Sequence, residues 1–334
     1  MKICVFGAGA VGGFMAANLA RAAKHEVSLV ARGAHLEAIR TRGLTLRTRT
    51  EEFTVRPHAA TAAPRELPPQ DLVIVTLKAQ SQPAAAADIA ALLAPGASAV
   101  FANNGIPWWW THRGAGAPGR PLPLLDPDAQ LWSRITPART IGCVIFSANE
   151  VVAPGVVQHS ANNRFLLGEP DGRMSARVQA IAQALQDGGL GGETTPDIRR
   201  WVWTKLLRNA PVNPLCALTR LPVNALADDP QLLALYNAVI DELAALAAAQ
   251  GTDLAAELPA AREVARKGPA LDGSAPRAIK PSMLQDAIAG RSLEVEAILG
   301  QLHEFGRESA VATPAIDFLL PLLRGLDRSI RSPA

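Results

Sequence analysis

The sequence contains few cysteines: Cys4, Cys143 and Cys216 are the three in 334 residues. They are odd in number and stand among apolar neighbours, so we expect buried thiols in a reducing compartment rather than disulfides. There is no C-x-x-C pair and no cluster of histidine and cysteine, and we therefore expect no metal site. The compartment that fits these features is the cytoplasm.

Long apolar runs and dense runs of one charge are also missing. No stretch of about 18 uninterrupted apolar residues occurs, so we expect no membrane span. The N-terminal apolar run is too short for the core of a signal peptide. The net charge is only +3, and no Lys/Arg run is interleaved with aromatic residues, so we expect no nucleic-acid partner. A mild positive balance does suit a polyanionic cofactor.

What the sequence does contain is typical of a globular protein. Hydrophobic residues make up 49% of the chain and charged residues 19%, and a chain of this length has material for two domains. The oligomeric state is left open by the sequence, with a homodimer as one option.

The first thirteen residues, MKICVFGAGAVGG, organise the first half of the chain. A short apolar run predicts a buried strand, and Gly7, Gly9 and Gly12 follow it in G-x-G-x-x-G spacing before a helix-like stretch. In this motif Gly7 permits the tight turn, Gly9 lets the backbone approach a pyrophosphate, and Gly12 lets helix and strand pack closely. The N-terminus of the helix offers free N–H groups to phosphates. The motif therefore predicts dinucleotide binding.

Arg32 follows the second predicted strand, 20 residues after Gly12. Enzymes that prefer NAD place an acidic residue here to bind the ribose 2′-hydroxyl. A guanidinium instead pairs with a 2′-phosphate, so we interpret Arg32 as a sign of NADP(H). The alternative is an ordinary solvated arginine.

Strands and helices alternate through the first half, as expected of an α/β domain of the Rossmann type. Strands are predicted at residues 27–30, 44–55 (a pair), 71–77, 97–102 and 139–147, and an antiparallel pair at 156–159 and 164–167. Helices are predicted at residues 11–23, 33–43, 83–93 and 174–185, and loops at 57–70 and 111–138.

Polar residues follow two of these strands. Lys78 comes after the strand at 71–77, and Asn104 comes after the strand at 97–102, in the sequence Asn103-Asn104-Gly105. Ligands of open α/β sheets bind beyond the carboxyl ends of the strands, so both residues could reach a cofactor. A lysine that reaches solvent and a plain Asn-Gly turn remain the alternatives.

Two further features of this half stand out. Trp108, Trp109 and Trp110 are adjacent and cannot all face one core, so we expect at least one to line a pocket or a partner surface. His159 alternates with apolar neighbours, and we interpret it as an outward-facing polar strand residue rather than a catalytic one.

Residues 188–196, GGLGGETTP, form the best candidate linker. Beyond it, helices are predicted at residues 198–219, 230–250, 257–267, 282–289, 293–309 and 313–323. We therefore divide the chain into an NADP-binding Rossmann-like domain at 1–190 and an all-α substrate and catalytic domain at 196–334.

Lys205, Asn209 and Asn213 step by four along the first helix of the second domain, in the sequence WVWTKLLRNAPVNPL, so they share one face. Such a polar strip on a helix rich in Ala, Leu and Trp points into a cleft or forms a solvated stripe. Further along, the sequence SMLQD begins at Ser282, and Glu294 follows it.

With these residues, the chain resembles the ketopantoate reductase family, the 2-dehydropantoate 2-reductases, over nearly its whole length. The resemblance rests on FGAGAVGG, TLKA and NNG, and more specifically on WTKLLRNAPVNPL and SMLQD with Glu294. It implies a Rossmann domain followed by a helical domain similar to the C-terminal domain of 6-phosphogluconate dehydrogenase. It also implies NADPH-dependent reduction of 2-dehydropantoate, a small 2-oxo acid, to pantoate on the route to pantothenate and coenzyme A.

The resemblance also implies roles for individual residues. The lysine matched by Lys205 is the general acid, and the glutamate matched by Glu294 lies near that lysine and the cofactor. Substrate binding is assigned to Asn104, Asn209, Asn213 and Ser282. Cofactor binding is assigned to Gly7, Ala8, Gly9, Ala10, Val11, Gly12, Arg32, Lys78, Asn104, Ala148 and Glu294.

The match departs from the family at one substrate position. A further asparagine of some members falls near Val223 and Asn224, and the aligned residue here is Val223. One alternative is therefore a paralogous NADPH-dependent reductase of another 2-oxo acid. A second alternative is a non-catalytic dinucleotide sensor, which has no need of a proton donor at Lys205.

Overall fold

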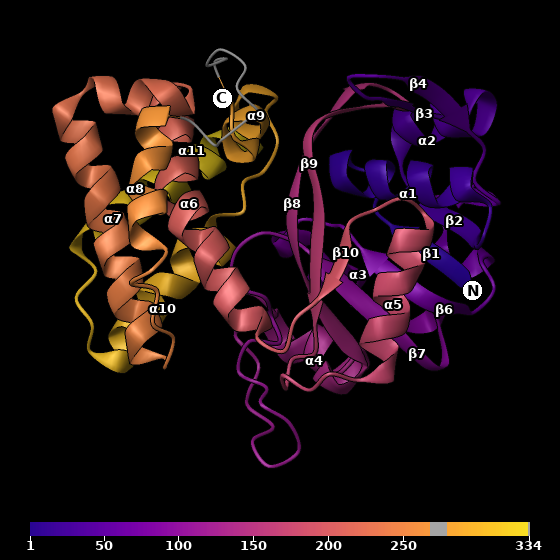
Figure 1. Ribbon diagram of the computed structural model, residues 1–334, viewed down its shortest axis with the longest axis horizontal. Helices are drawn as coiled ribbons and strands as arrows, with labels where there is room; N and C mark the ends of the chain where they lie inside the picture. The colour runs from indigo at the N-terminus through magenta and orange to yellow at the C-terminus, as the bar shows by residue number, and fades with distance from the viewer. Residues whose placement is uncertain (268–278, 333–334) are drawn as a thin grey trace. The chain divides into compact units, whose positions relative to one another are not determined.

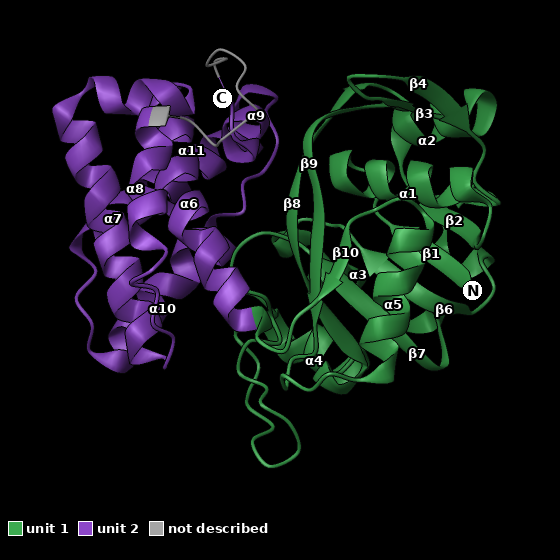
Figure 2. Ribbon diagram, viewed as in Figure 1, with its two compact units in different colours: residues 1–198 green, residues 199–334 purple. Residues whose placement is uncertain are grey.

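The computed structural model describes residues 1–267 and 279–332. The chain divides into two compact units, residues 1–198 and residues 199–334 (Figure 2). The first is an α/β unit built on a single sheet, and the second is helical (Figure 1).

The described part of unit 1 forms a ten-stranded sheet in the order β4-β3-β9-β8-β7-β6-β1-β2-β5, with β10 paired to β9. Its strands are β1 (Lys2–Phe6), β2 (Glu26–Val30), β3 (Leu44–Arg47), β4 (Glu52–Val55), β5 (Ala59–Thr61), β6 (Gln70–Val75), β7 (Leu93–Ala102), β8 (Thr140–Ala153), β9 (Val156–Gly168) and β10 (Gly192–Thr194). The strands from β5 across to β8 run parallel, whereas β8–β9 and β3–β4 are antiparallel. The carboxyl ends of β7, β6, β1 and β2 therefore lie at one edge of the sheet.

The helices of unit 1 connect these strands. They are α1 (Ala10–Ala22), α2 (Gly33–Arg42), α3 (Gln82–Leu92), α4 (Gln130–Arg134) and α5 (Ala176–Asp187). Single 3-10 turns occur at Pro64–Glu66, Ala79–Ser81, Pro127–Ala129 and Pro137–Arg139. Together with the parallel strands, this alternation confirms the predicted Rossmann-type α/β domain.

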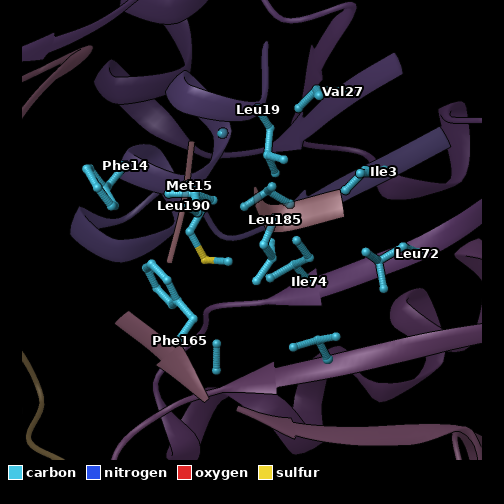
Figure 3. Packing of buried hydrophobic residues seen from close by; sticks show 14 of the residues in the cluster. Ile3, Phe14, Met15, Leu19, Val27, Leu72, Ile74, Phe165, Leu185 and Leu190 are labelled. Atoms are coloured by element: carbon cyan, nitrogen blue, oxygen red, sulfur yellow. The ribbon is translucent and has the colours of Figure 1, made fainter. Parts of the chain in front are cut away.

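Apolar side chains from the sheet, α1 and α5 form the core of unit 1. Figure 3 shows Met15 and Leu19 of α1 among Ile74, Phe165 and Leu185. Met15, Leu19 and Ile74 are fully buried, because the helix places residues four apart on one face and the strands alternate their side chains. This burial fixes α1 on the sheet, and with it the glycine turn that precedes α1.

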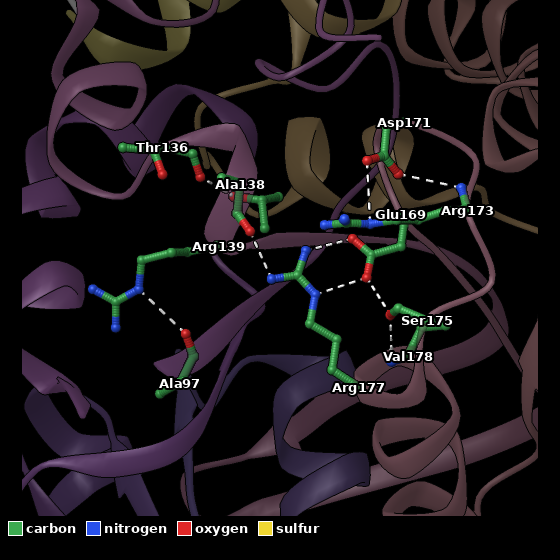
Figure 4. A network of polar contacts seen from close by, with 11 residues as sticks. Ala97, Thr136, Ala138, Arg139, Glu169, Asp171, Arg173, Ser175, Arg177 and Val178 are labelled. Atoms are coloured by element: carbon green, nitrogen blue, oxygen red, sulfur yellow. Dashed lines mark hydrogen bonds and ion pairs between the residues drawn. The ribbon is translucent and has the colours of Figure 1, made fainter. Parts of the chain in front are cut away.

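An ion pair between the buried Glu169 and the half-buried Arg177 fixes the start of α5 (Figure 4). The Arg177 guanidinium donates to both carboxylate oxygens of Glu169, which is 1% exposed, and to the carbonyl oxygen of Ala138 at 2.6 Å. Ser175 caps the helix by accepting from the Val178 amide, and its hydroxyl donates to Glu169 at 2.5 Å. Because the buried charges are paired and hydrogen-bonded, their desolvation is compensated.

Several predicted segments differ in the structure. Residues 57–70 include β5 and a 3-10 turn, and residues 111–138 include α4, so neither segment is entirely loop. Residues 156–159 and 164–167 do not pair with each other, because both belong to β9, which pairs with β8.

The predicted linker at 188–196 contains β10, which pairs in parallel with β9. Its glycines serve close packing: a Cβ on Gly191 would lie 2.0 Å from the Asn163 carbonyl oxygen, and one on Gly192 would lie 2.7 Å from the Ala182 carbonyl oxygen.

The three adjacent tryptophans are all buried in unit 1. Trp108, Trp109 and Trp110 are 2%, 1% and 2% exposed, so none of them offers a partner surface; the other expectation, that one of them lines a pocket, stays a prediction. Trp108 packs edge to face with Phe101 and Trp132 at centroid distances of 5.3 and 6.3 Å. The chain turns tightly here: the Trp110 amide donates to the Pro107 carbonyl oxygen at 3.1 Å, and the His112 amide donates to that of Trp109 at 3.0 Å.

Unit 2 consists of helices around an apolar interior. They are α6 (Ile198–Thr219), α7 (Pro230–Ala249), α8 (Leu258–Lys267), α9 (Ser282–Ile288), α10 (Gln301–Ser309) and α11 (Pro314–Arg331), with a 3-10 turn at Val223–Asp228 and a π-helical turn at Glu296–Gly300. The predicted helix at 293–309 begins later than predicted, with the π-helical turn that runs directly into α10, and the last helix extends eight residues beyond its predicted end at 323.

The helix α7 is long and apolar enough, by length and composition, to be a candidate membrane span. In the structure it contacts α8, α10 and α11. Its residues Tyr236, Val239 and Leu243 are fully buried, as expected of a core helix. Its Glu242 carboxylate caps α11 by accepting from the amides of Ala315 and Ile316 at 2.6 and 2.9 Å.

Candidate functional site

The glycine turn between β1 and α1 has the geometry that the fingerprint requires. Gly7 has a φ of +109°, and its amide donates to the Val30 carbonyl oxygen at 3.0 Å. A Cβ on Gly12 would lie 1.9 Å from the Gly7 carbonyl oxygen, whereas a Cβ on Gly9 would meet no atom within 4 Å. Packing therefore requires a glycine at position 12. At position 9 a glycine instead leaves the backbone open to the approach of a ligand.

The first turn of α1 is free to bind an anion. Gly9 is the N-cap and has no side chain to cap the helix, and no acidic residue stands in the first turn. Ala10 and Val11 are half-buried in this turn, and Ala8 before it is buried. The amides of a helix N-terminus and its partial positive charge suit a phosphate, so these residues fit a dinucleotide.

Arg32 lies between the end of β2 and the start of α2. It is exposed, and it makes no ion pair with a described residue. Arg32 is also the N-cap of α2, whose first turn has no acidic side chain and no side-chain cap. A free guanidinium beside an uncapped helix N-terminus fits a phosphate better than a ribose diol.

Lys78 and Asn104 lie beyond the carboxyl ends of β6 and β7, and Ala148 lies within the neighbouring strand β8. Lys78 is half-buried after β6, and Asn104 is half-buried after β7. Ala148 lies within β8 between two irregularities in its pairing with β9, which the sequence pattern did not reveal. Such bulges re-aim backbone groups and occur next to active sites. Because β6, β7 and β8 are neighbours in the sheet, these three residues line the side of unit 1 that carries the glycine turn.

His159 differs from its predicted role as an outward-facing residue. Its ring stacks on Phe14 of α1 with centroids 4.3 Å apart, and its Nδ1 lies 2.8 Å from Asn149 Oδ1. Asn149 in turn donates to Ser147 Oγ at 2.9 Å. Burial lowers the pKa of His159, which favours the neutral ring in this stack. The contacts connect β8, on both sides of Ala148, to α1.

His35 is a residue of this region that the sequence reasoning missed. It lies in the first turns of α2, and its Nδ1 accepts from the Gly155 amide at 3.0 Å. This contact joins α2 to the turn between β8 and β9. Burial lowers the pKa of His35. The sequence offered no local signal, because Gly155 lies 120 residues away.

Lys205, Asn209 and Asn213 lie on α6 and share one face of it, as predicted. Lys205 and Asn209 are half-buried, whereas Asn213 is 2% exposed. The Nδ2 atom of Asn213 is buried and has no hydrogen-bond partner in the described protein. A buried amide without a partner is costly, so this end of the strip fits a polar ligand or water.

Arg208 lies on the same helix, three residues after Lys205, and the sequence reasoning also missed it. It is half-buried, and no carboxylate of the described residues pairs with it. Burial lowers the pKa of Arg208, and the neighbouring Tyr236 opposes this effect. An arginine so placed attracts an anion.

The segment that follows α6 approaches the start of α9. The Val223 amide donates to the Ile279 carbonyl oxygen at 3.0 Å, three residues before Ser282, which is exposed at the first position of α9. The neighbouring Asn224 has a buried Oδ1 without a partner in the described protein. Asn224 is thus a polar residue with an unpartnered, buried oxygen next to Val223.

Glu294 is buried, with 9% of its surface exposed. It lies in the segment between α9 and the π-helical turn, and its carbonyl oxygen accepts from the Ile298 amide at 3.2 Å. π-Helical turns are rare and frequently occur at functional sites. The described residues include no group of three or more His, Cys, Asp or Glu side chains that could hold a metal ion.

Comparisons with known proteins match both units. Residues 3–172 match the family described as "Ketopantoate reductase PanE/ApbA", and residues 197–327 match its C-terminal part. A 2-dehydropantoate 2-reductase from Mesorhizobium japonicum is 42% identical over 328 residues, covering 98% of each chain.

Solved structures agree with these matches. A PanE/ApbA family ketopantoate reductase from Ralstonia eutropha superposes with a TM-score of 0.83 at 27% identity, covering 99% of this chain and 100% of the other. A 2-dehydropantoate 2-reductase from Methylococcus capsulatus gives 0.80 at 27% identity, covering 99% and 98%.

Proposed function

Since the chain belongs to the ketopantoate reductase family, we propose that it catalyses the NADPH-dependent reduction of 2-dehydropantoate to pantoate, a step toward pantothenate and coenzyme A. The observation that carries this proposal is the polar strip Lys205, Asn209 and Asn213 on α6, which ends in a buried, unpartnered amide. A dinucleotide sensor needs neither a proton donor nor a substrate-binding amide at these positions.

The cofactor proposal rests on unit 1. The open backbone at Gly9 and the uncapped N-terminus of α1 suit the pyrophosphate, and Lys78, Asn104 and Ala148 line the same edge. The free, exposed Arg32 supports NADP(H) over NAD(H). When bound, the nicotinamide supplies the hydride that the C2 ketone receives.

The residues of unit 2 supply the remaining chemistry. Negative charge develops on the ketone oxygen during reduction, and the Lys205 ammonium stabilises it and then donates a proton from Nζ to that oxygen. Asn209, Asn213 and Ser282 hold the carboxylate and hydroxyl groups of the substrate without adding net charge. The buried carboxylate of Glu294 holds the lysine in position and balances its charge.

A second candidate is the reduction of a different 2-oxo acid, and Arg208 is the observation that favours it. A half-buried guanidinium without a carboxylate partner in the described chain, one turn from Lys205, suits a substrate with a second anionic group. The replacement of the family asparagine by Val223 points in the same direction.

One assay separates these functions. NADPH oxidation at 340 nm is followed with 2-dehydropantoate and with a panel of 2-oxo monocarboxylic and dicarboxylic acids. A turnover of 2-dehydropantoate well above the panel supports the first proposal, and preference for a dicarboxylic acid supports the second. Tight NADPH binding without turnover of any 2-oxo acid in the panel would favour the remaining alternative, a non-catalytic dinucleotide sensor. We further expect a cytoplasmic enzyme, consistent with three buried cysteines that form no disulfide.

A further inference from the structure

The segment that carries Glu294 has no regular secondary structure before the π-helical turn, yet it is held on both sides by one helix. Asp327 of α11 accepts at Oδ1 from the Leu293 amide at 2.7 Å and from Ser292 Oγ at 3.1 Å. Arg324 of α11 donates to both carboxylate oxygens of Glu296, at 2.8 and 2.7 Å. These contacts flank Glu294: Asp327 holds the two residues immediately before it, and Arg324 holds the residue two positions after it.

Arg324 and Asp327 are three residues apart on α11 and therefore share a face of the helix. Each contact is strong for its kind. Asp327 is 9% exposed, and its Oδ2 is also paired with Arg331 at 2.9 Å. The Arg324–Glu296 pair is bidentate, and the hydrogen bond that Arg324 donates to Glu296 raises the pKa of Arg324.

The π-helical turn depends on the same carboxylate. A Cβ on Gly300 would lie 2.0 Å from Glu296 Oε2, so the Glu296 side chain folds back over the turn, and a larger residue at position 300 would displace this carboxylate. Before the segment, Asp286 of α9 holds Arg291 through its backbone oxygen and its Oδ1, at 2.8 and 2.9 Å. The backbone on either side of Glu294 is thus tied to α9 and to α11.

We propose that Asp327 and Arg324 are positioning residues that hold Glu294 in the geometry its catalytic role needs; this inference rests on the proposed function. A carboxylate on irregular backbone loses its orientation readily, because many backbone and side-chain conformations compete with the productive one. Displacing a catalytic group by about 1 Å can cost about 10²-fold in rate. Neither positioning residue is required to touch the substrate.

The test compares variants of the whole enzyme. Asp327→Ala removes the acceptor for Leu293, and Arg324→Met removes the bidentate pair. We expect each to lower kcat by about 10-fold or more, with the KM for substrate and the Kd for NADPH within about 3-fold of the parent. Asp327→Asn keeps one acceptor oxygen for the Leu293 amide and should restore most of kcat.

Two variants serve as controls. Arg331→Met removes only the outer partner of Asp327, and Arg262→Met removes an arginine–aspartate pair of the same unit, Arg262–Asp241. Both should keep kcat within about 2-fold, since each removed arginine is partly or largely solvent-accessible and ion pairs of such arginines contribute little. If Asp327→Ala and Arg324→Met lower only the melting temperature and match these controls in kcat, the proposal is wrong.

A measurement without turnover separates this proposal from the proposed function. Hydrogen–deuterium exchange should show faster exchange at residues 291–300 in Asp327→Ala than in the parent and in Arg262→Met. Unchanged exchange overturns the proposal whether or not the parent enzyme is active. If the parent enzyme reduces no 2-oxo acid, the proposed function is wrong. The proposal that Asp327 and Arg324 hold the segment around Glu294 is then tested by hydrogen–deuterium exchange alone.

Discussion

A Cβ atom on Gly12 would lie 1.9 Å from the carbonyl oxygen of Gly7. The first turn of α1 therefore touches the end of β1 backbone to backbone. The contact is completed by the Thr76 hydroxyl, which donates to the same oxygen at 2.5 Å. Gly9, three residues earlier, has open space where its side chain would be.

This difference predicts that two Gly→Ala substitutions in one motif act differently. Gly12→Ala should destabilise the protein by about 3 kcal/mol, because the turn must open to admit the methyl group. Gly9→Ala should change stability by about 0.5 kcal/mol or less, since its φ of −65° suits alanine, but should weaken NADPH binding. Urea unfolding and NADPH fluorescence measure the two effects. Equal stability losses would show that Gly9 is also required for packing.

Arg32 should determine the preference between the two nicotinamide cofactors. Arg32→Ala should raise the Kd of NADPH by about 10- to 100-fold, the scale of a lost hydrogen bond to a charged group, with little change for NADH. Arg65→Ala, which removes an exposed arginine paired with Asp88 at 3.1 Å, is the charge-matched control. An unchanged preference in Arg32→Ala would assign the 2′-phosphate to another cation.

Lys205 should be the proton donor. Lys205→Ala should lower kcat by about 10²-fold or more, the usual scale for an acid–base group, while NADPH binding persists because all the cofactor-binding candidates except Glu294 lie in unit 1. Lys2→Ala, on the exposed first residue of β1, controls for the loss of one lysine. Turnover of Lys205→Ala at the parent rate would remove Lys205 from the mechanism.

Three histidines of unit 1 should make the protein less stable in mild acid. Burial lowers the pKa values of His25, His35 and His159, so the folded state keeps them neutral while the unfolded state protonates them below about pH 6.5. Their contribution is complete above that pH and is lost as the pH falls through the folded-state pKa values.

Urea midpoints measured from pH 7.5 to 5 check this loss. His35→Asn offers the Gly155 amide an oxygen acceptor that does not titrate, so it should make the pH dependence shallower. If the urea midpoint depends on pH equally in His35→Asn and in the parent, His35 does not contribute to the loss of stability in acid.

Trp109 should contribute to the core rather than to a surface. It is 1% exposed, and a Cβ on Gly142 would lie 2.4 Å from its ring and 3.1 Å from Ile198. Trp109→Ala should lower the free energy of unfolding by about 3–5 kcal/mol, as for other buried large residues. Phe318→Ala, at an exposed site of α11, should change it by about 0.5 kcal/mol or less. Similar small losses in both variants would contradict this role.

Local patterns in the sequence were sufficient for much of the fold. The glycine spacing and the apolar run before it specify β1, the turn and α1, because each depends on residues within a dozen positions. The four-residue steps of Lys205, Asn209 and Asn213 placed them on one face of α6 because the helix has a fixed period. The positions where Arg32, Lys78 and Asn104 follow strands were also visible, since strand ends are marked by local composition. Their roles stay predictions.

The tertiary structure decided what depends on residues far apart in the chain. Residues 188–196 look like a linker by composition, yet β9 offered an edge and β10 pairs with it. Adjacent tryptophans could not be assigned to core or surface until Phe101, Trp132 and Gly142 surrounded them. The backbone around Glu294 is fixed by Asp327, 33 residues later, and no local period records such a contact. Sequence patterns report the faces of single elements, whereas partners across the fold are chosen by packing and by the pairing of buried polar groups.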